Sequence, residues 1–387
     1  MNKMALILGS GFSTLSSLPA TKKVNDTFLN APDNSSIVQE IGINGSVIDD
    51  FMTKVLAGFW ENVFGYNSKK PDNLPSLEDH FTAIDFAANS GHSLGGKYSP
   101  QKLRAIRRFS IHRIFDILDA RYTSNKAIHM LFEGLNNNGK PFHPVITTNW
   151  DIVVEKHLQD SNIKYNYGIN VIPVDRSPTT INMLRGGIPL YKLHGSSNWV
   201  YCESCRRIFA GVGKTSLHKL IFIQPNDFEI MGADKGIVDE VIKLKSTFPP
   251  CRKCNNNTLS CRPATFSYRK DFSLSHFGTI WEKAHTRLSN SDVWCFIGYS
   301  LPNADFELKH LLKSAQVAKK RPLRKIIAYL YDGRNLANRK VRQKQLYSYE
   351  EENARYKSFF GSINVEVNGE GLTNESVDKI LSSLHKK

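Results

Sequence analysis

Three polar side chains with complementary chemistry follow apolar runs in the sequence. Asn149 and Asp151 come after the run Pro144–Thr147, and His194 comes after Pro189–Leu193, directly before a glycine. A histidine supplies a base at neutral pH, and an amide and a carboxylate can orient a polar substrate. Together the three suit cleavage of a bond in a nucleotide. Each alone also has a structural explanation, because Asn and Asp favour loops and helix caps and a histidine can simply be buried.

A glycine turn that suits phosphate binding follows the first apolar run, Met4–Leu8. A strand, a glycine turn and a helix start bring backbone N–H groups close to a phosphate. The spacing is G-x-G-x-S rather than the full G-x-G-x-x-G, so the turn by itself does not identify a nucleotide site. It comprises Gly9, Ser10, Gly11, Phe12 and Ser13.

Two further apolar runs end in small or polar residues. Val293–Ile297 leads into Gly298 and Ser300, and Ile326–Leu330 leads into Asp332. Open α/β sheets present such groups to a ligand at the carboxyl ends of their strands. We therefore predict an open α/β sheet.

Residues 35–139 differ from the flanking segments because their pattern is helical. The apolar residues between Ile111 and Leu118 fall at i, i+3, i+4 and i+7, and strand alternation is absent from this part of the sequence. We predict a helical module inserted into a nucleotide-binding domain made of residues 1–34 and 140–387. The sheet of that domain is expected to end near residue 335.

Four of the six cysteines form two C-x-x-C knuckles separated by residues 206–250. Two knuckles can place four thiolates about 2.3 Å from one zinc ion. We predict a structural zinc in a small ribbon-like insertion over residues 201–262, with ligands Cys202, Cys205, Cys251 and Cys254. The gap exceeds the usual length of roughly 15–20 residues, so a degenerate or redox-sensitive pair of knuckles is the alternative. Cys261 could replace one ligand.

The composition excludes several classes of protein. Of the 387 residues, 41% are hydrophobic and 22% are charged, unlike a disordered chain, a coiled coil or a collagen-like fibre. The apolar runs are far shorter than the roughly 18 residues of a membrane helix. The apolar run near the N-terminus is also shorter than a secretory h-region of about 7–15 residues. We therefore expect a cytoplasmic protein.

The net charge is +15, from 51 Lys and Arg against 36 Asp and Glu, and part of it is concentrated. Residues 301–348 carry twelve Lys or Arg and three acids. Such a basic stretch attracts a polyanion or an acidic partner, although it can equally be a solvated face. It contains no recognisable DNA- or RNA-recognition motif, so direct nucleic-acid binding has no support from a motif.

The chain resembles the sirtuins, and within them the sirtuin-like branch found in bacterial antiphage defence proteins. Six motifs occur in the family's order over roughly residues 4–335. Residues 9–19 resemble the nucleotide loop, residues 147–151 resemble T-Q-N-x-D, and residues 193–196 resemble L-H-G. The knuckles follow in the place of the family's zinc module, residues 263–265 resemble P-P-T, and residues 296–305 resemble G-T-S-L in its G-Y-S-L-P-x-x-D form.

The resemblance implies an α/β fold with a doubly wound, Rossmann-like parallel sheet. It also implies that NAD binds at the switch point of this sheet and that its nicotinamide–ribose bond is cleaved. Asn149 would hold the ribose or a water, Asp151 the nicotinamide carboxamide, and His194 would be the general base. The implied binding residues are Gly9, Ser10, Gly11 and Ser13 at the pyrophosphate, Gly298 and Ser300 at the adenosine end, and, with no more specific role, Phe12 and Asp332.

Two departures from the deacylating sirtuins bear on the activity. Leu18–Val24 lacks the Phe-Arg pair of their G-I-P-x-F-R segment, and His276–Trp281 lacks the Glu of their F-G-E strand and reads as a helix. The acyl-peptide cleft is therefore expected to be missing. This favours an NAD hydrolase (an NAD⁺ glycohydrolase with water as acceptor) that depletes NAD in antiphage defence. The alternatives are an NAD-dependent protein deacylase and a non-catalytic NAD- or ADP-ribose-binding regulatory subunit.

An NAD hydrolase that was always active would kill its host, so the resemblance implies that the site is gated. Similar effectors work beside a HerA-type DNA-translocating ATPase, an argonaute-like protein or a phage sensor. About fifty residues follow the expected end of the sheet, which is too few for a large sensor domain. We therefore expect a homo-oligomer and a separate partner such as a HerA-type ATPase, docked on the basic stretch.

Overall fold

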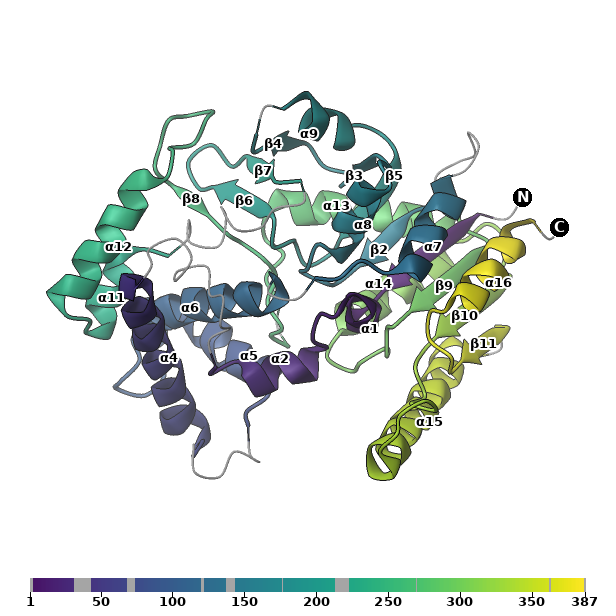
Figure 1. Cartoon of the computed structure of the whole chain (residues 1–387), viewed down its shortest axis with the longest axis horizontal. Coiled ribbons are helices and arrows are strands. Elements are labelled where there is room, and N and C mark those ends of the chain that lie inside the picture. The colour runs from purple at the N-terminus through teal and green to yellow at the C-terminus, as the bar shows by residue number, and fades with distance from the viewer. Residues whose placement is uncertain are drawn as a thin grey trace. The chain divides into compact units, whose positions relative to one another are not determined.

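The computed structural model describes residues 3–30, 43–67, 74–119, 122–136, 143–175, 177–212, 223–268, 270–361 and 363–385. The chain divides into two compact units. The first comprises Met1–Leu18, Thr123–Ser196 and Phe272–Lys387, and the second comprises Pro19–Tyr122 and Ser197–Asp271. Figure 1 labels the elements of both units. Among the described residues, helices long and apolar enough to cross a membrane are absent.

A seven-stranded parallel sheet forms the centre of the first unit. Its strands are β1 (Met4–Leu8), β2 (Val145–Thr147), β3 (Tyr165–Asn166), β5 (Ile188–Lys192), β9 (Val293–Ile297), β10 (Lys325–Tyr329) and β11 (Val365–Asn368). Their order is β11-β10-β9-β1-β2-β5-β3, and all neighbours are parallel. β1 and β9 are buried along their whole length, as expected of strands covered on both faces.

The crossovers of this sheet run in opposite directions from its centre. The chain moves from β1 to β2 on one side, and from β9 to β10 on the other. Because such crossovers are right-handed, their helices cover opposite faces, and the predicted doubly wound sheet is confirmed. In Figure 1, α7 packs against α8 and α16, and α13 packs against α14. The unit contains α1 (Ser10–Ser13), a 3-10 turn (Thr14–Ser16), α7 (Lys126–Asn136), α8 (Val153–Asp160), β4 (Val171–Pro173), α9 (Pro178–Met183), α13 (Ser275–Ser289), α14 (Phe306–Val317), α15 (Arg339–Phe360) and α16 (Asn374–His385).

The sheet does not end near residue 335, so that expectation was wrong. β11 pairs with β10 from Ile326↔Val365 to Tyr329↔Asn368. This edge strand reads Val-Glu-Val-Asn, with Glu366 exposed. It lacks the continuous apolar run by which the inner strands are recognised, because an edge strand has less surface to bury.

The second unit is mainly helical, as the pattern within residues 35–139 predicts. Ser76 caps α5, its hydroxyl accepting from the Asp79 N–H over 3.0 Å. In Figure 1, α6 packs against α4, α5 and α11. The helices are α2 (Thr21–Thr27), α4 (Ile43–Phe64), α5 (Leu77–Asn89), α6 (Pro100–Asp119), α11 (Pro225–Met231) and α12 (Lys235–Thr247). β6 (Trp199–Cys202) pairs antiparallel with both β7 (Ile208–Ala210) and β8 (Leu259–Ser260).

The compact units and the predicted inserted segments divide the chain differently. The cysteine-bearing segment 201–262 and most of the segment 35–139 lie in one unit, whereas α7 belongs to the other. The domain boundaries proposed from the sequence stay a prediction.

A fully buried histidine helps to organise the helical core of the second unit. Trp60 Nε1 donates to His80 Nδ1 over 2.9 Å, and His80 Nε2 lies 2.8 Å from Ser110 Oγ. Because Nδ1 accepts, the imidazole is neutral with its proton on Nε2, which donates to Ser110. Burial lowers the pKa of His80 to about 3, so the ring stays neutral in the folded protein.

Candidate functional site

Three glycines bring two loops together where the crossovers of the sheet reverse. The Gly9 N–H donates to the Ile297 carbonyl over 3.1 Å, and the Gly11 N–H donates to the Gly298 carbonyl over 2.9 Å. A methyl group on Gly298 would lie 2.2 Å from the backbone nitrogen of Phe12, and its φ of +60° also favours glycine. The turn after β1 and the end of β9 therefore meet at the edge where doubly wound sheets bind nucleotides.

The N–H groups of this turn are partly used within the protein. Besides the two glycine bonds, the Phe12 N–H donates to the Gly9 carbonyl over 3.0 Å. In this structure the glycines thus contribute close approach of the backbone, while their own N–H groups already have partners.

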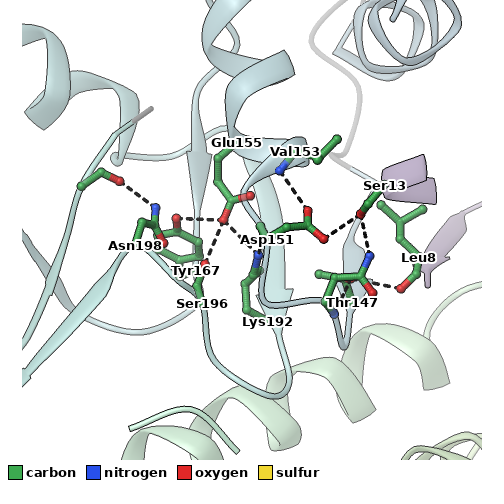
Figure 2. Close-up of polar contacts among 12 residues, drawn as sticks. Leu8, Ser13, Thr147, Asp151, Val153, Glu155, Tyr167, Lys192, Ser196 and Asn198 are labelled. Atoms are coloured by element: carbon green, nitrogen blue, oxygen red, sulfur yellow. Dashed lines mark hydrogen bonds and ion pairs between the residues drawn. The ribbon is translucent and has the colours of Figure 1, made fainter. Parts of the chain in front are cut away.

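Ser13 joins the turn to the loop that follows β2. Its Oγ donates to Asp151 Oδ2 over 2.7 Å and accepts from Asn149 Nδ2 over 3.0 Å. Asn149 Nδ2 also donates to the Gly9 carbonyl over 2.8 Å. Ser13 and Asp151 are buried, and Figure 2 shows their contact. Three residues predicted from distant motifs therefore form one hydrogen-bonded cluster.

Local capping sets the orientation of the loop after β2. The Thr147 hydroxyl accepts from the Asn149 N–H over 3.1 Å and donates to the Leu8 carbonyl over 3.0 Å. Asp151 Oδ1 accepts from the Val153 N–H over 3.1 Å, at the start of α8. The Asp151 side chain, which lies just ahead of α8, is thereby held by an N–H group in the first turn of that helix.

The pairing of β2 with β5 places Asn149 and His194 in adjacent loops. Thr147 lies opposite Lys192, and each of the two site residues comes two positions later. His194 is only 6% exposed. The structure thus brings the predicted base to the same edge of the sheet as the Ser13 cluster.

Two aromatic rings that the sequence analysis did not single out lie beside His194. Its ring centroid lies 6.0 Å from that of Phe272 and 6.4 Å from that of Trp281. Trp281 Nε1 donates to the Leu193 carbonyl over 3.1 Å, which ties α13 to the end of β5. In the sequence, the signal for this contact is the group of aromatic residues within residues 272–281.

A buried ion pair, also missed from the sequence, lies beside the loops that follow β2 and β5. Lys192 Nζ lies 3.3 Å from Glu155 Oε1, with side chains 1% and 0% exposed. Lys192 also donates to the Asp151 backbone carbonyl, and Glu155 Oε1 accepts from Tyr167 and Ser196 over 3.1 and 3.4 Å (Figure 2). Burial raises the pKa of Glu155, and Lys192 opposes that effect. A lysine closing an apolar strand run was the signal for this pair.

The residues predicted for the adenosine end lie on the other half of the sheet. The Ser300 carbonyl accepts from Arg355 Nη1 over 3.0 Å. Both carboxylate oxygens of Asp332 accept from Arg334, over 2.6 to 3.1 Å, and this bonding lowers the pKa of Asp332. In the described part of the chain, hydrogen bonds between these residues and the Ser13 cluster are absent. The structure brings Gly298 to the turn after β1 but leaves Asp332 paired with Arg334.

The four predicted cysteine ligands converge in the second unit. Their sulfur atoms all lie within 4.8 Å of one another. Cys202 and Cys254 are 3.6 Å apart, and Cys205 and Cys251 are 3.7 Å apart. A tetrahedron of sulfurs about 2.3 Å from zinc has edges of about 3.8 Å, so the cluster fits that ion. Cys261, considered as a substitute ligand, is not in the cluster.

Both knuckles have the same backbone geometry. The Arg206 N–H donates to the Cys202 carbonyl over 2.8 Å, and the Asn255 N–H donates to the Cys251 carbonyl over 2.7 Å. Arg206 and Asn255 have φ values of +57° and +58°. Each turn is thus closed by a left-handed residue that directs two sulfurs the same way, which is consistent with a shared metal.

Comparison with known proteins finds one matching family profile. The profile of the SIR2-like domain matches residues 143–354. Three similar solved structures each cover 99% of this chain at 14% identity. They are Sir2 with the inhibitor EX-527, 2′-O-acetyl-ADP-ribose and deacetylated p53 peptide (94% of that chain, TM-score 0.38), Sir2 bound to acetylated peptide (93%, 0.39), and Sir2 with p53 peptide and NAD⁺ (93%, 0.38). No curated protein sequence matches the chain.

Proposed function

The chain belongs to the SIR2-like family, and from that premise we propose that it cleaves the nicotinamide–ribose bond of NAD with water as acceptor. The observation that carries the proposal is the cluster of Ser13, Asn149 and Asp151, with His194 in the loop that follows the neighbouring strand β5. The reaction consumes NAD⁺ and water and yields nicotinamide, ADP-ribose and one proton.

Asn149 is suited to orient a water or a ribose hydroxyl. Both hydrogens of its Nδ2 are donated, one to the Gly9 carbonyl and one to Ser13. Its Oδ1 is therefore the atom that can accept from a substrate hydroxyl or from the attacking water. Because the amide is anchored twice, this acceptor is oriented before the substrate binds.

Asp151 is suited to the nicotinamide carboxamide. Its two oxygens accept from Ser13 and from the Val153 N–H, and each carboxylate oxygen has a second lone pair for a substrate donor. As the bond to nicotinamide lengthens, the ribose acquires positive charge, which a nearby carboxylate stabilises.

His194 is suited to accept the proton that the reaction releases. A neutral imidazole can take a proton from the attacking water or from a ribose hydroxyl as the C1′–N bond breaks. The rings of Phe272 and Trp281 beside it limit the access of bulk water.

The helix α13 favours water over an acyl-peptide as the acceptor. It spans Ser275–Ser289 and so includes the segment His276–Trp281. A peptide that binds as an added strand needs an extended edge, and a helix has its N–H and C=O groups paired internally. An NAD-dependent deacylase is the second candidate, and a regulatory subunit that binds NAD or ADP-ribose without turnover is the third.

The biological role that we propose is NAD depletion in antiphage defence, with activity gated by assembly. We propose a homo-oligomer and a separate partner such as a HerA-type ATPase. We propose that this partner docks on the exposed cations at the start of α15, which are Arg339, Lys340, Arg342 and Lys344. The four-cysteine cluster would hold a structural zinc with no part in the reaction.

Nicotinamide release from NAD by the purified chain, alone and with the partner ATPase, tests the proposal. We expect release without any peptide, unchanged when an acetyl-lysine peptide is added. Release that requires the peptide would establish the deacylase instead. NAD binding without release, both alone and with the partner ATPase, would establish the regulatory subunit.

A further inference from the structure

The lysine–glutamate pair beside the Asn149–Asp151 and His194 loops is closed to solvent. Lys192 and Glu155 are 1% and 0% exposed, so a ligand in the site does not reach either side chain. We propose that the two are positioning residues that hold the Asp151 loop and the His194 loop in a fixed relation. This inference rests on the proposed function, because that function makes the two loops the site of NAD cleavage.

The pair links the two loops through contacts on both sides. Lys192 Nζ donates to the backbone carbonyl of Asp151. Glu155 Oε1 accepts from the hydroxyl of Ser196, two residues beyond His194, over 3.4 Å. The Asp151 loop is therefore tied to the lysine, the His194 loop is tied to the glutamate, and the ion pair of 3.3 Å closes the link (Figure 2).

Tyr167 extends the link to a third segment. Its hydroxyl donates to the same Glu155 oxygen over 3.1 Å, from the residue directly after β3. One carboxylate oxygen thus receives hydrogen bonds from two strand ends and faces the ammonium group at the end of β5. In the observed arrangement of the loops, all these contacts are made at once.

Stability alone does not explain such a pair. The cost of removing two charges from water roughly offsets their attraction, and apolar residues of similar volume often stabilise a protein as well or better. Geometry does explain it, because displacing catalytic groups by about 1 Å can cost on the order of 100-fold in rate.

A double-mutant cycle separates positioning from stability. The variants are Lys192→Met, Glu155→Gln and the two combined. We expect kcat for nicotinamide release to fall at least about tenfold in all three, with KM changed less than about threefold. The combined variant should recover the thermal stability that the single variants lose, because it leaves no unpaired buried charge, but it should not recover kcat.

The exposed Lys325–Glu366 pair between β10 and β11 is a matched control. The same two substitutions there, Lys325→Met and Glu366→Gln, should leave kcat unchanged. If kcat fell as far as it does in the variants of the buried pair, the loss of an ion pair distant from the two loops would lower kcat equally. The effect could then not be assigned to the positioning of the loops.

Amide hydrogen exchange gives a readout that does not depend on turnover. In the combined variant, amides of residues 149–153 and 193–196 should exchange at least about tenfold faster, while those of β1 and β9 keep their protection. Return of wild-type kcat together with stability, or unchanged exchange in both loops, would overturn the proposal. If the wild-type chain releases no nicotinamide, either alone or with the partner ATPase, the proposed function fails, and the exchange rates still decide whether the pair holds the loops.

Discussion

The Gly11 N–H donates to the Gly298 carbonyl over 2.9 Å, so the first turn of the sheet and the end of β9 touch through their backbones. This contact requires glycine on both sides. A methyl group on Gly11 would lie 2.9 Å from the Gly298 Cα, and one on Gly298 would lie 2.3 Å from the Gly11 carbonyl carbon. The candidate nucleotide site therefore depends on a close approach that any side chain would prevent.

Gly298→Ala should displace the turn after β1 and abolish NAD cleavage. We expect it to lower the free energy of unfolding by about 1–3 kcal/mol more than Gly186→Ala does, because a methyl must be forced into packed backbone. Gly186 has a φ of +82° but open space around its Cα, so the matched variant carries the conformational strain alone. Chemical denaturation and nicotinamide release measure the two effects. Equal destabilisation by both substitutions would refute the role of close approach.

Asn149→Ala and His194→Ala should each reduce nicotinamide release by about 10²–10⁴-fold while the protein stays folded. Asn149→Asp should also be inactive, because it loses the two hydrogens donated to Gly9 and Ser13. Kinetics of NAD turnover, with circular dichroism as the check of folding, measure the outcome. Wild-type turnover in the two alanine variants would reject the site.

Serine at any one of Cys202, Cys205, Cys251 and Cys254 should lower both zinc content and thermal stability. The wild-type protein should carry about one zinc per chain, because four converging thiolates make a closed structural site. Elemental analysis and thermal unfolding measure this. Cys261→Ala is the control, since that thiol lies outside the cluster and should not change the zinc content. A folded, active preparation without zinc would count against the site.

At pH values below about 6.5, the stability of the second unit should decrease. The pKa of His80 is about 3 when folded, below its ordinary value of 6.5, so between these values the unfolded chain binds a proton that the folded chain does not. Stability is therefore lost as the pH falls, at about 1.4 kcal/mol per pH unit from this group. His80→Gln, which keeps an acceptor and a donor, should lose about 2 kcal/mol less between pH 6.5 and pH 5 in urea unfolding. Parallel pH dependences of the two proteins would refute this assignment.

Neutralising the start of α15 should weaken docking of the partner. Several cations of the basic stretch 301–348 are already engaged. Lys319 donates to backbone carbonyls, Lys325 pairs with Glu366, and Arg334 pairs with Asp332. Exposed cations on α15 are Arg339, Lys340, Arg342 and Lys344. Changing these four to Gln should reduce co-purification with the ATPase, and added salt should weaken the wild-type complex, since exposed charges are screened over about 8 Å. The same exchange at Lys54, Lys235, Lys243 and Arg252 is the control for loss of charge. Unaltered binding by the α15 variant would remove the docking role.

The inner strands, the glycine turn, the helical character of the second unit and the two cysteine knuckles could all be predicted from the sequence. These features are local, since a buried parallel strand reads as an apolar run, a close backbone approach needs glycine, and two knuckles need C-x-x-C spacing. Edge strand β11 was not predicted because an edge strand buries too little surface to leave an apolar run.

Which polar groups meet depends on the three-dimensional arrangement of the strands. Ser13 and Asp151 are far apart in the chain, and the pairing of β1 with β2 brings Ser13 Oγ within 2.7 Å of Asp151 Oδ2. Likewise, the pairing of Lys192 with Glu155 is not evident from the sequence. Lys192 shows only as a lysine in an apolar run, and Glu155 reads as surface until the packing around it is known. Burial and long-range pairing depend on every element that covers a residue, so they follow from the assembled sheet and not from local spacing.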